Sequence, residues 1–392
     1  MAAPLLKVRT CTVGVHLRRG DQSQWFSSLK EAAGFNSAAS AHLTAAGFEV
    51  QTTRVATNSF EEWCDLKDPD AALKAFHALD AELKRLGIGL FNAGPAMSPA
   101  ALALVPRLVA IGPRISFSGS MESPLDASVA TRLADAILAI SSATPGGEGN
   151  FQFCCSFNVP PGIPFFPAAY HESGTPTSFA IGCETSALLA DAFPRAGGDL
   201  RSAQAALTDL FHQQMAPIEA IALELAEAHG IVYKGIDASI APLGTAPPLT
   251  DAFESLGFGR FGESGTLAIS SVATAAVKAL RSRGLTICGY TGLMLPPCED
   301  AGLARRAEEQ GYRIHDLLMY SAVCGIGLDT VPIAGDVEPR KLAALLLDVA
   351  ALAYRLDKPL SARLFPVPGL KAGDRTRFTN PYLCDTRVFD VP

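Results

Sequence analysis

SAVCGIGLDTVPI, residues 321–333, is an apolar run broken by glycines, with a thiol and a carboxylate, Cys324 and Asp329, five residues apart. Glycine lets the backbone take positive φ angles or approach another segment closely, so a bend here could turn both side chains toward one site. The plainer interpretation is a buried strand ending in a turn, with an inert cysteine and an aspartate bonded to nearby backbone. The rest of the chain favours the first interpretation, and we predict Cys324 and Asp329 as catalytic residues.

On both sides of this stretch, short apolar runs alternate with helical patterns. The sequence predicts strands at 7–16, 48–55, 88–91, 115–117, 151–157, 178–182, 231–240, 284–288 and 360–365. It predicts helices at 22–33, 37–46, 70–86, 99–110, 126–140, 184–193, 201–229, 265–283 and 338–354, and a charged helix after Asp300. Parallel neighbours need such crossover connections, so we predict a mostly parallel α/β sheet surrounded by helices. No linker or low-complexity segment suggests a boundary, so we expect residues 1–392 to form a single large domain.

The composition predicts a large core and no strongly charged partner. The 392 residues are 48% hydrophobic and 18% charged, with a formal net charge of −7. This balance predicts a folded protein and argues against nucleic acid or an anionic membrane as a partner. Nine cysteines, an odd number without a CxxC pair, fit reduced thiols in the cytosol better than a disulfide framework. Lys7, Arg9 and Thr10 interrupt the apolar run that a signal peptide needs, and no stretch is long enough to span a membrane. We therefore expect a cytoplasmic protein.

Polar or reactive residues follow most of the predicted strands. They are Asn92, Ser118, Asn158, Asp237, Tyr290 and Cys324. Ligands of parallel α/β sheets bind beyond the carboxyl ends of the strands, so in a parallel sheet these residues would gather on one rim. The alternative is that loops are polar in general and that Asn, Ser and Asp favour turns. We predict that Asn92, Ser118, Asn158 and Tyr290 contact a small-molecule ligand.

His171 is the histidine whose surroundings most suggest chemistry. It follows the apolar, proline-rich run 159–167 and is next to Glu172 and Ser173. An imidazole in such a place can serve as a general base or a metal ligand. The alternative is a partly buried histidine that bonds only to backbone. We predict His171 as a catalytic residue.

Carboxylates offer a possible metal site. Asp237, Glu299 and Asp300 could hold a hard cation such as Mg²⁺ or Ca²⁺ through oxygen. The alternative for Glu299 and Asp300 is that they cap the following helix, whose dipole favours negative charge. The sequence contains no HxxxH, HExxH or CxxC and therefore no strong zinc signature. We expect no nucleotide cofactor, because there is no P-loop and no predicted strand leads into GFGRFG at 257–262.

Several blocks in a fixed order give the chain a family resemblance. They are NVPPGIPF at 158–165, AAYHESG at 168–174, GIDASIAP at 235–242, ESGTLA at 263–268, GYTGLMLPPCEDAGL at 289–303 and CGIGLDTVPI at 324–333. Over nearly the whole chain the sequence resembles the domain of unknown function 711 family, also called uncharacterised protein family 0210. Among its landmark positions, Gly265, Thr266 and Gly292 join the expected ligand contacts.

The resemblance implies a fold related to the ten-stranded, barrel-like α/β architecture of pyruvate formate-lyase. It brings no reaction, because the family's function is unassigned. Two local echoes of glycyl-radical enzymes occur, FCCS at 153–156 and ICGY at 287–290. No arginine precedes the glycine in the fashion of the radical motif, and a fold does not fix a function. Cys154 and Cys155 are adjacent, so in a strand they would point to opposite faces.

The leading hypothesis is a cytosolic enzyme that acts on a small polar metabolite at the carboxyl-end rim. Its chemistry would be non-redox acid–base or metal-assisted, in a lyase, isomerase or hydrolase. His171 would be the general acid or base, Cys324 a nucleophile or its partner, and Asp237 and Asp329 would orient them or hold a cation. One alternative is a non-catalytic small-molecule or metal-binding protein that forms a homo-oligomer through the helix at 201–229. The other is a glycyl-radical enzyme.

Overall fold

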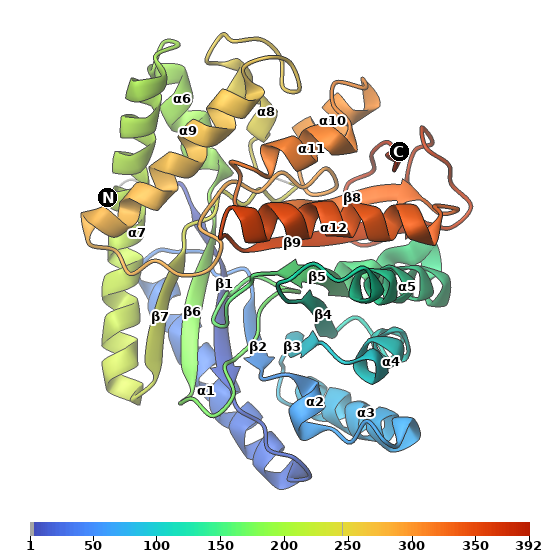
Figure 1. Cartoon of the computed structure of the whole chain (residues 1–392). Helices are drawn as coiled ribbons and strands as arrows, with labels where there is room; N and C mark the ends of the chain where they lie inside the picture. The colour runs from blue at the N-terminus through green and yellow to red at the C-terminus, as the bar shows by residue number, and fades with distance from the viewer. Residues whose placement is uncertain (1–3, 245) are drawn as a thin grey trace.

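The computed structural model describes residues 4–244 and 246–392, which form an α/β structure around one nine-stranded sheet (Figure 1). The strands are β1 (Lys7–Val15), β2 (Thr53–Thr57), β3 (Leu90–Ala96), β4 (Ile115–Met121), β5 (Phe153–Phe157), β6 (Ser178–Glu184), β7 (Val232–Asp237), β8 (Gly327–Ala334) and β9 (Leu360–Val367). The α-helices are α1 (Gln22–Ala45), α2 (Phe60–Trp63), α3 (Pro69–Arg85), α4 (Pro99–Val109), α5 (Ala127–Ala143), α6 (Ser186–Arg195), α7 (Leu200–His229), α8 (Leu249–Glu254), α9 (Thr266–Lys278), α10 (Ala301–Glu308), α11 (Ile314–Tyr320) and α12 (Pro339–Arg355). Two 3-10 helices are η1 (Pro145–Gln152) and η2 (Ala279–Arg283).

The sheet is mostly parallel, as predicted. Its order is β7-β6-β1-β2-β3-β4-β5-β9-β8, and in the described chain six of the eight neighbouring pairs are parallel. The antiparallel pairs are β1 with β6 and β5 with β9. Strands β1 to β5 therefore run in one direction, and the two strands on each side of them run in the other.

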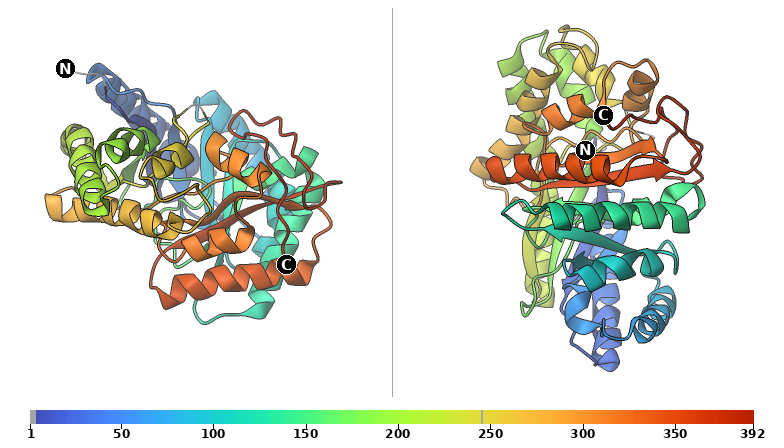
Figure 2. Two further views of the ribbon diagram at one scale, coloured as in Figure 1. Left: turned by 90° about the horizontal axis from the view of Figure 1, so that it is seen from above. Right: turned by 45° about the vertical axis from the view of Figure 1, so that its right-hand side comes forward.

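Helices cover one face of the sheet. In Figure 1, α3, α4 and α5 follow one another beside β3 to β5, α12 lies beside β9, and α1 and α7 flank β1 and β7. The right-hand view of Figure 2 shows α12 directly alongside α5. Cys11 and Val13 of β1 pack in the core on this side. Side chains alternate along a strand, so Thr10 and Thr12 point to the opposite face.

The opposite face is filled by irregular chain. The proline-rich segment 158–172 crosses it and is fixed by hydrogen bonds from two strands. Thr12 Oγ1 donates to the Pro164 carbonyl at 2.8 Å, and Asn92 Nδ2 donates to the Pro167 carbonyl at 2.7 Å. Prolines prevent the segment from pairing as a central strand, so side chains of the sheet satisfy its carbonyls instead.

The adjacent cysteines of β5 point to opposite faces, as the strand prediction requires. Cys155 belongs to the core beneath the helices. Cys154 belongs to a small cluster on the other face with Phe165 and Tyr290. Burial raises the pKa of Cys154 to about 12, so this thiol is neutral at physiological pH.

Two predicted helices and one predicted strand differ from the structure. Residues 22–33 and 37–46 belong to one helix, α1, which passes through Gly34 without a break. A helical glycine costs only about 1 kcal/mol, so it does not have to end a helix. Residues 284–288 form no strand of the sheet and make an isolated bridge between Ile236 and Ile287. None of the helices in the described part of the chain combines the length and apolar character that a membrane crossing requires.

The stretch 321–333 contains a buried strand, as its plainer interpretation expects, but the strand begins after Cys324, so the prediction that Cys324 follows a strand is wrong. Strand β8 begins at Gly327 and pairs with β9, and its residues are buried up to Ile333. Gly327 takes a φ of 96°, and a Cβ there would lie 2.3 Å from the Ser361 carbonyl oxygen. The close approach of β9 therefore requires glycine at this position.

Candidate functional site

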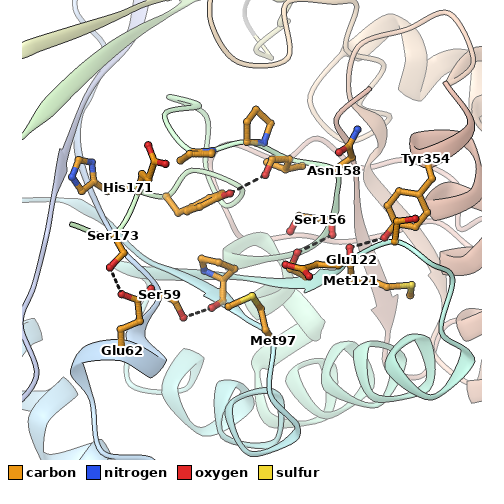
Figure 3. A pocket seen from close by; sticks show the side chains of 18 residues that line it. Ser59, Glu62, Met97, Met121, Glu122, Ser156, Asn158, His171, Ser173 and Tyr354 are labelled. Atoms are coloured by element: carbon orange, nitrogen blue, oxygen red, sulfur yellow. Dashed lines mark hydrogen bonds between the residues drawn. The ribbon is translucent and has the colours of Figure 1, made fainter. Parts of the chain in front are cut away.

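A pocket of about 520 Å³ opens where β2, β3, β4 and β5 end (Figure 3). Its lining residues come from these strand ends, from α2 and its cap, from the segment after β5 and from α12. They are Ser59, Glu62, Pro95, Met97, Ser120, Met121, Glu122, Ser123, Ser156, Asn158, Val159, Pro160, Pro161, Tyr170, His171, Glu172, Ser173 and Tyr354. The pocket lies at the carboxyl-end rim, which is where the sequence predicts a site. We call it the carboxyl-end pocket.

Carboxylates dominate the charge of the carboxyl-end pocket. Glu62, Glu122 and Glu172 line it, and the described chain contributes no lysine or arginine to its wall. Grouped negative charges repel a further anion and attract cations. Ionised carboxylates also accept hydrogen bonds without donating any. The pocket therefore suits a neutral or positively charged molecule that carries hydrogen-bond donors.

Glu62 is held from two sides at the edge of this pocket. Asn58 Nδ2 donates to Glu62 Oε2 at 2.9 Å. The Ser173 hydroxyl donates to the same oxygen, as Figure 3 shows. Asn58 is itself fixed, because its Oδ1 accepts from the Leu17 N–H at 2.9 Å. Within the described chain Glu62 Oε1 has no hydrogen-bond partner. That oxygen is free to accept a proton or a hydrogen bond from a ligand.

His171 lies at the edge of the pocket with its ring packed against β1. The residue is 3% exposed, and a Cβ on Gly14 would come within 2.5 Å of its Nδ1. Nδ1 lies 3.4 Å from Ser178 Oγ, and Nε2 lies 3.3 Å from the Thr175 carbonyl oxygen and 3.2 Å from its hydroxyl. Burial lowers the pKa of His171, so the imidazole is neutral at physiological pH. Both ring nitrogens thus face protein groups.

Two tyrosines in the pocket wall already donate their hydroxyl hydrogen bonds to backbone carbonyls. The Tyr170 hydroxyl donates to the Val159 carbonyl at 3.0 Å, and the Tyr354 hydroxyl donates to the Met121 carbonyl at 2.6 Å. Burial raises the pKa of each phenol to about 12. Neither hydroxyl therefore acts as an acid near neutral pH, and their bonds fix the segment after β5 and the end of β4.

The predicted rim residues divide between the pocket and the sheet interior. Asn158 lines the pocket with a positive φ of 55°, and its Nδ2 donates to Asp357 at 3.2 Å. Asn92 is buried, and its Oδ1 accepts from the Gly94 N–H at 2.8 Å. Ser118 is 1% exposed, and its hydroxyl has no partner in the described chain. Only Asn158 of these three is placed to touch a ligand in the pocket.

The central stretch does not contribute to the carboxyl-end pocket. Cys324 is buried, and its carbonyl accepts from Lys358 Nζ. Asp329 is 4% exposed, and its Oδ1 accepts from Arg363 Nε at 2.8 Å. The structure therefore does not bring either residue to His171.

The other residues predicted to contact a ligand lie among protein groups away from the carboxyl-end pocket. Gly265 and Thr266 begin α9, where the Thr266 hydroxyl accepts from the Gly262 N–H at 2.9 Å. Tyr290 lies in the small cluster with Cys154. A Cβ on Gly292 would lie 2.2 Å from the backbone of Gly325, so two chain segments touch there. None of these residues lines the carboxyl-end pocket.

The three predicted metal ligands have separate partners. Asp237 accepts from the N–H groups of Ser239, Tyr290 and Thr291. Asp300 accepts from the Leu303 N–H at 2.8 Å and caps α10, which is the alternative role expected of it. Glu299 pairs with Arg9 and Arg363. In the described parts of the chain no group of three His, Cys, Asp or Glu residues is placed to hold a metal ion.

Sequence reasoning missed the acidic residues of the pocket. Glu62 and Glu122 follow strands β2 and β4 and could have been found by the same strand-end rule. Glu62 was not predicted because it lies in α2, a four-residue helix that is too short to show a periodic pattern. Glu122 was not predicted because the predicted strand ends at Phe117, whereas β4 continues to Met121.

Comparison with known proteins places these residues in a family. The family model described as Uncharacterised ACR (DUF711) matches residues 1–379. A UPF0210 protein from Pyrobaculum arsenaticum is 34% identical over 230 residues, which are 57% of this chain and 51% of that protein. A UPF0210 protein from Oleidesulfovibrio alaskensis is 27% identical over 350 residues, which are 83% of this chain and 75% of that protein.

The match spans about half the length of the Pyrobaculum relative. Among solved structures, the methanol:cobalamin methyltransferase complex MtaBC from Methanosarcina barkeri aligns over 91% of this chain and 68% of that chain, with 10% identity and a TM-score of 0.23. That likeness is too low to support an argument about fold or function. The family model covers nearly the whole chain, and the chain therefore belongs to the DUF711 family, also called UPF0210.

Proposed function

We propose that the chain is an enzyme that binds a small polar metabolite, neutral or positively charged, in the carboxyl-end pocket. The observation that carries this proposal is the wall of three carboxylates, Glu62, Glu122 and Glu172, to which the described residues add no lysine or arginine. A cationic or donor-rich ligand offsets the mutual repulsion of these groups. The site would perform a non-redox, acid–base reaction of the lyase, isomerase or hydrolase class.

Glu62 is the proposed general base. Its Oε1 is free in the described structure, while Asn58 and Ser173 fix Oε2. A base must reach the proton that it removes, and a carboxylate held on one side with its other oxygen open meets this condition. Removal of a proton by Glu62 makes the substrate one charge unit more negative, so a substrate that starts with a positive charge ends neutral and suits a wall of carboxylates best. Glu62 then holds that proton on Oε1 and returns it to the substrate or releases it to solvent, while the Ser173 hydroxyl stays hydrogen-bonded to Oε2.

His171 has a positioning role in this proposal. Its ring contacts Thr175 and Ser178 and so ties the loop carrying Ser173 to β6. The proton-transfer role predicted for His171 from the sequence would require the imidazole to leave these contacts. Replacement by asparagine, which keeps a hydrogen-bonding side chain, should therefore reduce substrate affinity more than the rate of the bound complex.

A binding screen by ligand charge tests the proposal. Saturation-transfer NMR would be run on matched sets of small metabolites that differ in charge: amino alcohols and amines, polyols, and carboxylic acids. We expect signals from the first two sets in the wild type, weaker signals in Glu62→Gln, and unchanged signals in Glu227→Gln, whose carboxylate is exposed on α7. Binding confined to the acids, and indifferent to Glu62→Gln, would contradict it.

We also propose that the sheet closes into a barrel through residues 286–294. Support comes from hydrogen bonds along β7, where the Ile236 N–H donates to Thr286 at 2.8 Å and the Cys288 N–H donates back to Ile236 at 3.0 Å. On the far side, the Gly325 N–H donates to Leu293 at 2.8 Å. Ten strands would then run as two groups of five in opposite directions. Slow amide hydrogen exchange at Cys288 and Gly325 is the expected result, and rapid exchange at both would contradict closure.

A further inference from the structure

A second pocket, of about 410 Å³, opens at the other end of the parallel strands. Arg54 and Ser116, the second residues of β2 and β4, line it together with Leu90, the first residue of β3. The segment 158–172 lies between the two pockets, because it contributes Phe166 here and Tyr170 to the carboxyl-end pocket. We call the second one the amino-end pocket.

Arginines dominate the charge of the amino-end pocket, in contrast to the carboxyl-end pocket. Arg9, Arg54 and Arg363 all line it. Two of them are paired: Arg9 contacts Glu299 at 2.7 Å, and Arg363 contacts Glu299 at 2.5 Å and Asp329 at 2.8 Å. These two arginines and two carboxylates balance one another, which leaves the charge of Arg54 uncompensated.

Arg54 is buried without an ion-pair partner among the described residues. It is 8% exposed, its Nε donates to Thr52 Oγ1 at 3.1 Å, and its guanidinium lies 5.2 Å from the centre of the Phe166 ring. Burial, and then the neighbouring Arg9, lowers the pKa of Arg54 to about 9. The two terminal nitrogens of the guanidinium make no hydrogen bond in the described structure. A buried charge is costly unless something pairs with it.

The other groups around Arg54 suit an oxyanion with an apolar body. The Ser116 hydroxyl has no hydrogen-bond partner in the described chain and offers a second donor. Glu49 also lines the pocket, but its carboxylate is paired with Lys7 at 3.1 Å. Phe151 and Tyr382 supply an aromatic wall next to these polar groups. A planar guanidinium matches carboxylate and phosphate oxygens in pairs, and a pocket of this volume can take a small metabolite.

We propose that the amino-end pocket binds the carboxylate or phosphate group of a small organic acid through Arg54 and Ser116. The apolar part of the ligand lies against Phe151 and Tyr382. The bound anion supplies the charge that Arg54 lacks. This site is separate from the carboxyl-end pocket and prefers ligands of the opposite charge.

Isothermal titration calorimetry with three aromatic probes of similar size tests this proposal. Phenyl phosphate and benzoate carry the two candidate oxyanions, and benzyl alcohol carries neither. We expect the wild type to bind at least one of the two anions more tightly than benzyl alcohol, and the preferred one identifies the ligand class. Arg54→Gln should weaken anion binding tenfold or more. Arg107→Gln, which removes an exposed arginine of α4, should leave it unchanged.

Two outcomes would overturn the proposal. One is that neither anion binds more tightly than benzyl alcohol, and the other is that Arg54→Gln binds the anions as tightly as the wild type. If the glutamine variant does not fold, Arg54→Lys replaces it in the experiment and should also weaken anion binding. Lysine keeps the charge but lacks the planar pair of donors of arginine. Glu62→Gln should leave anion binding intact, so that failure at one pocket is distinguishable from failure at the other.

Discussion

Replacing Glu299 with glutamine tests the buried charge network that supports the amino-end pocket. Glu299 is 2% exposed and contacts Arg363 at 2.5 Å and Arg9 at 2.7 Å. Burial alone would raise the pKa of Glu299, but the two guanidinium groups outweigh burial and hold the pKa below its usual value. The carboxylate is therefore charged at neutral pH, and both arginines depend on it.

The expected loss of stability depends on which ion pairs each arginine retains in the variant. Removing one partner of a buried ion pair costs about 3–5 kcal/mol, because the other charge is left uncompensated. Arg363 retains Asp329 at 2.8 Å, whereas Arg9 keeps no other ion pair in the described chain. Glutamine can still accept one hydrogen bond. We therefore expect a loss at the lower end of that range, about 3 kcal/mol.

Urea unfolding at pH 7, followed by circular dichroism, measures this loss. Glu82→Gln is the matched control, because it removes a single i,i+3 pair with Arg85, whose side chain is 65% exposed, and should cost about 0.3–0.5 kcal/mol. An equal, small change in both variants would refute the reasoning, because it would mean that the network does not hold its charges as the geometry indicates.

The pH dependence of this effect has a defined sign. The pKa of Glu299 is lower in the folded chain than the unfolded value of about 4.3, so its stabilisation is present above that pH. It is lost as the pH falls through the folded pKa. The difference in the free energy of unfolding between wild type and Glu299→Gln should therefore shrink in acid. A difference that grows as the pH falls would contradict the assigned direction.

Three further predictions concern the surroundings of His171 and the thiol of the central stretch. Gly14→Ala should lower the free energy of unfolding by about 1–3 kcal/mol, because the new Cβ would lie 2.5 Å from His171 Nδ1. Thermal unfolding should show a smaller loss for Gly14→Ala when His171 is also replaced by alanine. NMR titration should place the pKa of His171 below 6.5. As the pH decreases from about 6.5, the free energy of unfolding should decrease, because the unfolded chain takes up a proton that the buried imidazole does not. An unshifted titration would contradict this. Cys324→Ala should leave ligand binding in the carboxyl-end pocket unchanged, since Cys324 does not line it, and lost binding in a folded variant would return Cys324 to the site.

Local sequence patterns predicted the alternation of strands and helices and the rim on which the carboxyl-end pocket lies. These features depend on nearest neighbours along the chain, such as the Ser98 hydroxyl that accepts from the Ala101 N–H at 3.2 Å and begins α4. The strand-end rule also found Asn158. It placed Asn92 and Ser118 wrongly, because β3 and β4 continue past them and bury both.

Contacts between distant segments could not be predicted from the sequence. Arg54 reads as an ordinary polar residue near the start of a strand, and only the path of segment 158–172 places Phe166 over it. Asp329 looked like a partner for Cys324, but β9 places Arg363 beside it. The predicted metal ligand Asp237 also has distant partners, since it accepts hydrogen bonds from backbone N–H groups more than fifty positions away.

Turnover by the wild type and Glu62→Gln tests the central claim most directly. Each protein would be incubated with the amines, amino alcohols or polyols that bind the wild type, and mass spectrometry and NMR would follow loss of substrate and solvent deuterium incorporation. The account predicts conversion or deuterium exchange by the wild type and by Glu227→Gln, and none by a folded Glu62→Gln. Equal activity in Glu62→Gln would contradict the assignment of Glu62 as the base, and binding without any conversion or exchange in the wild type would contradict the claim that the pocket is catalytic.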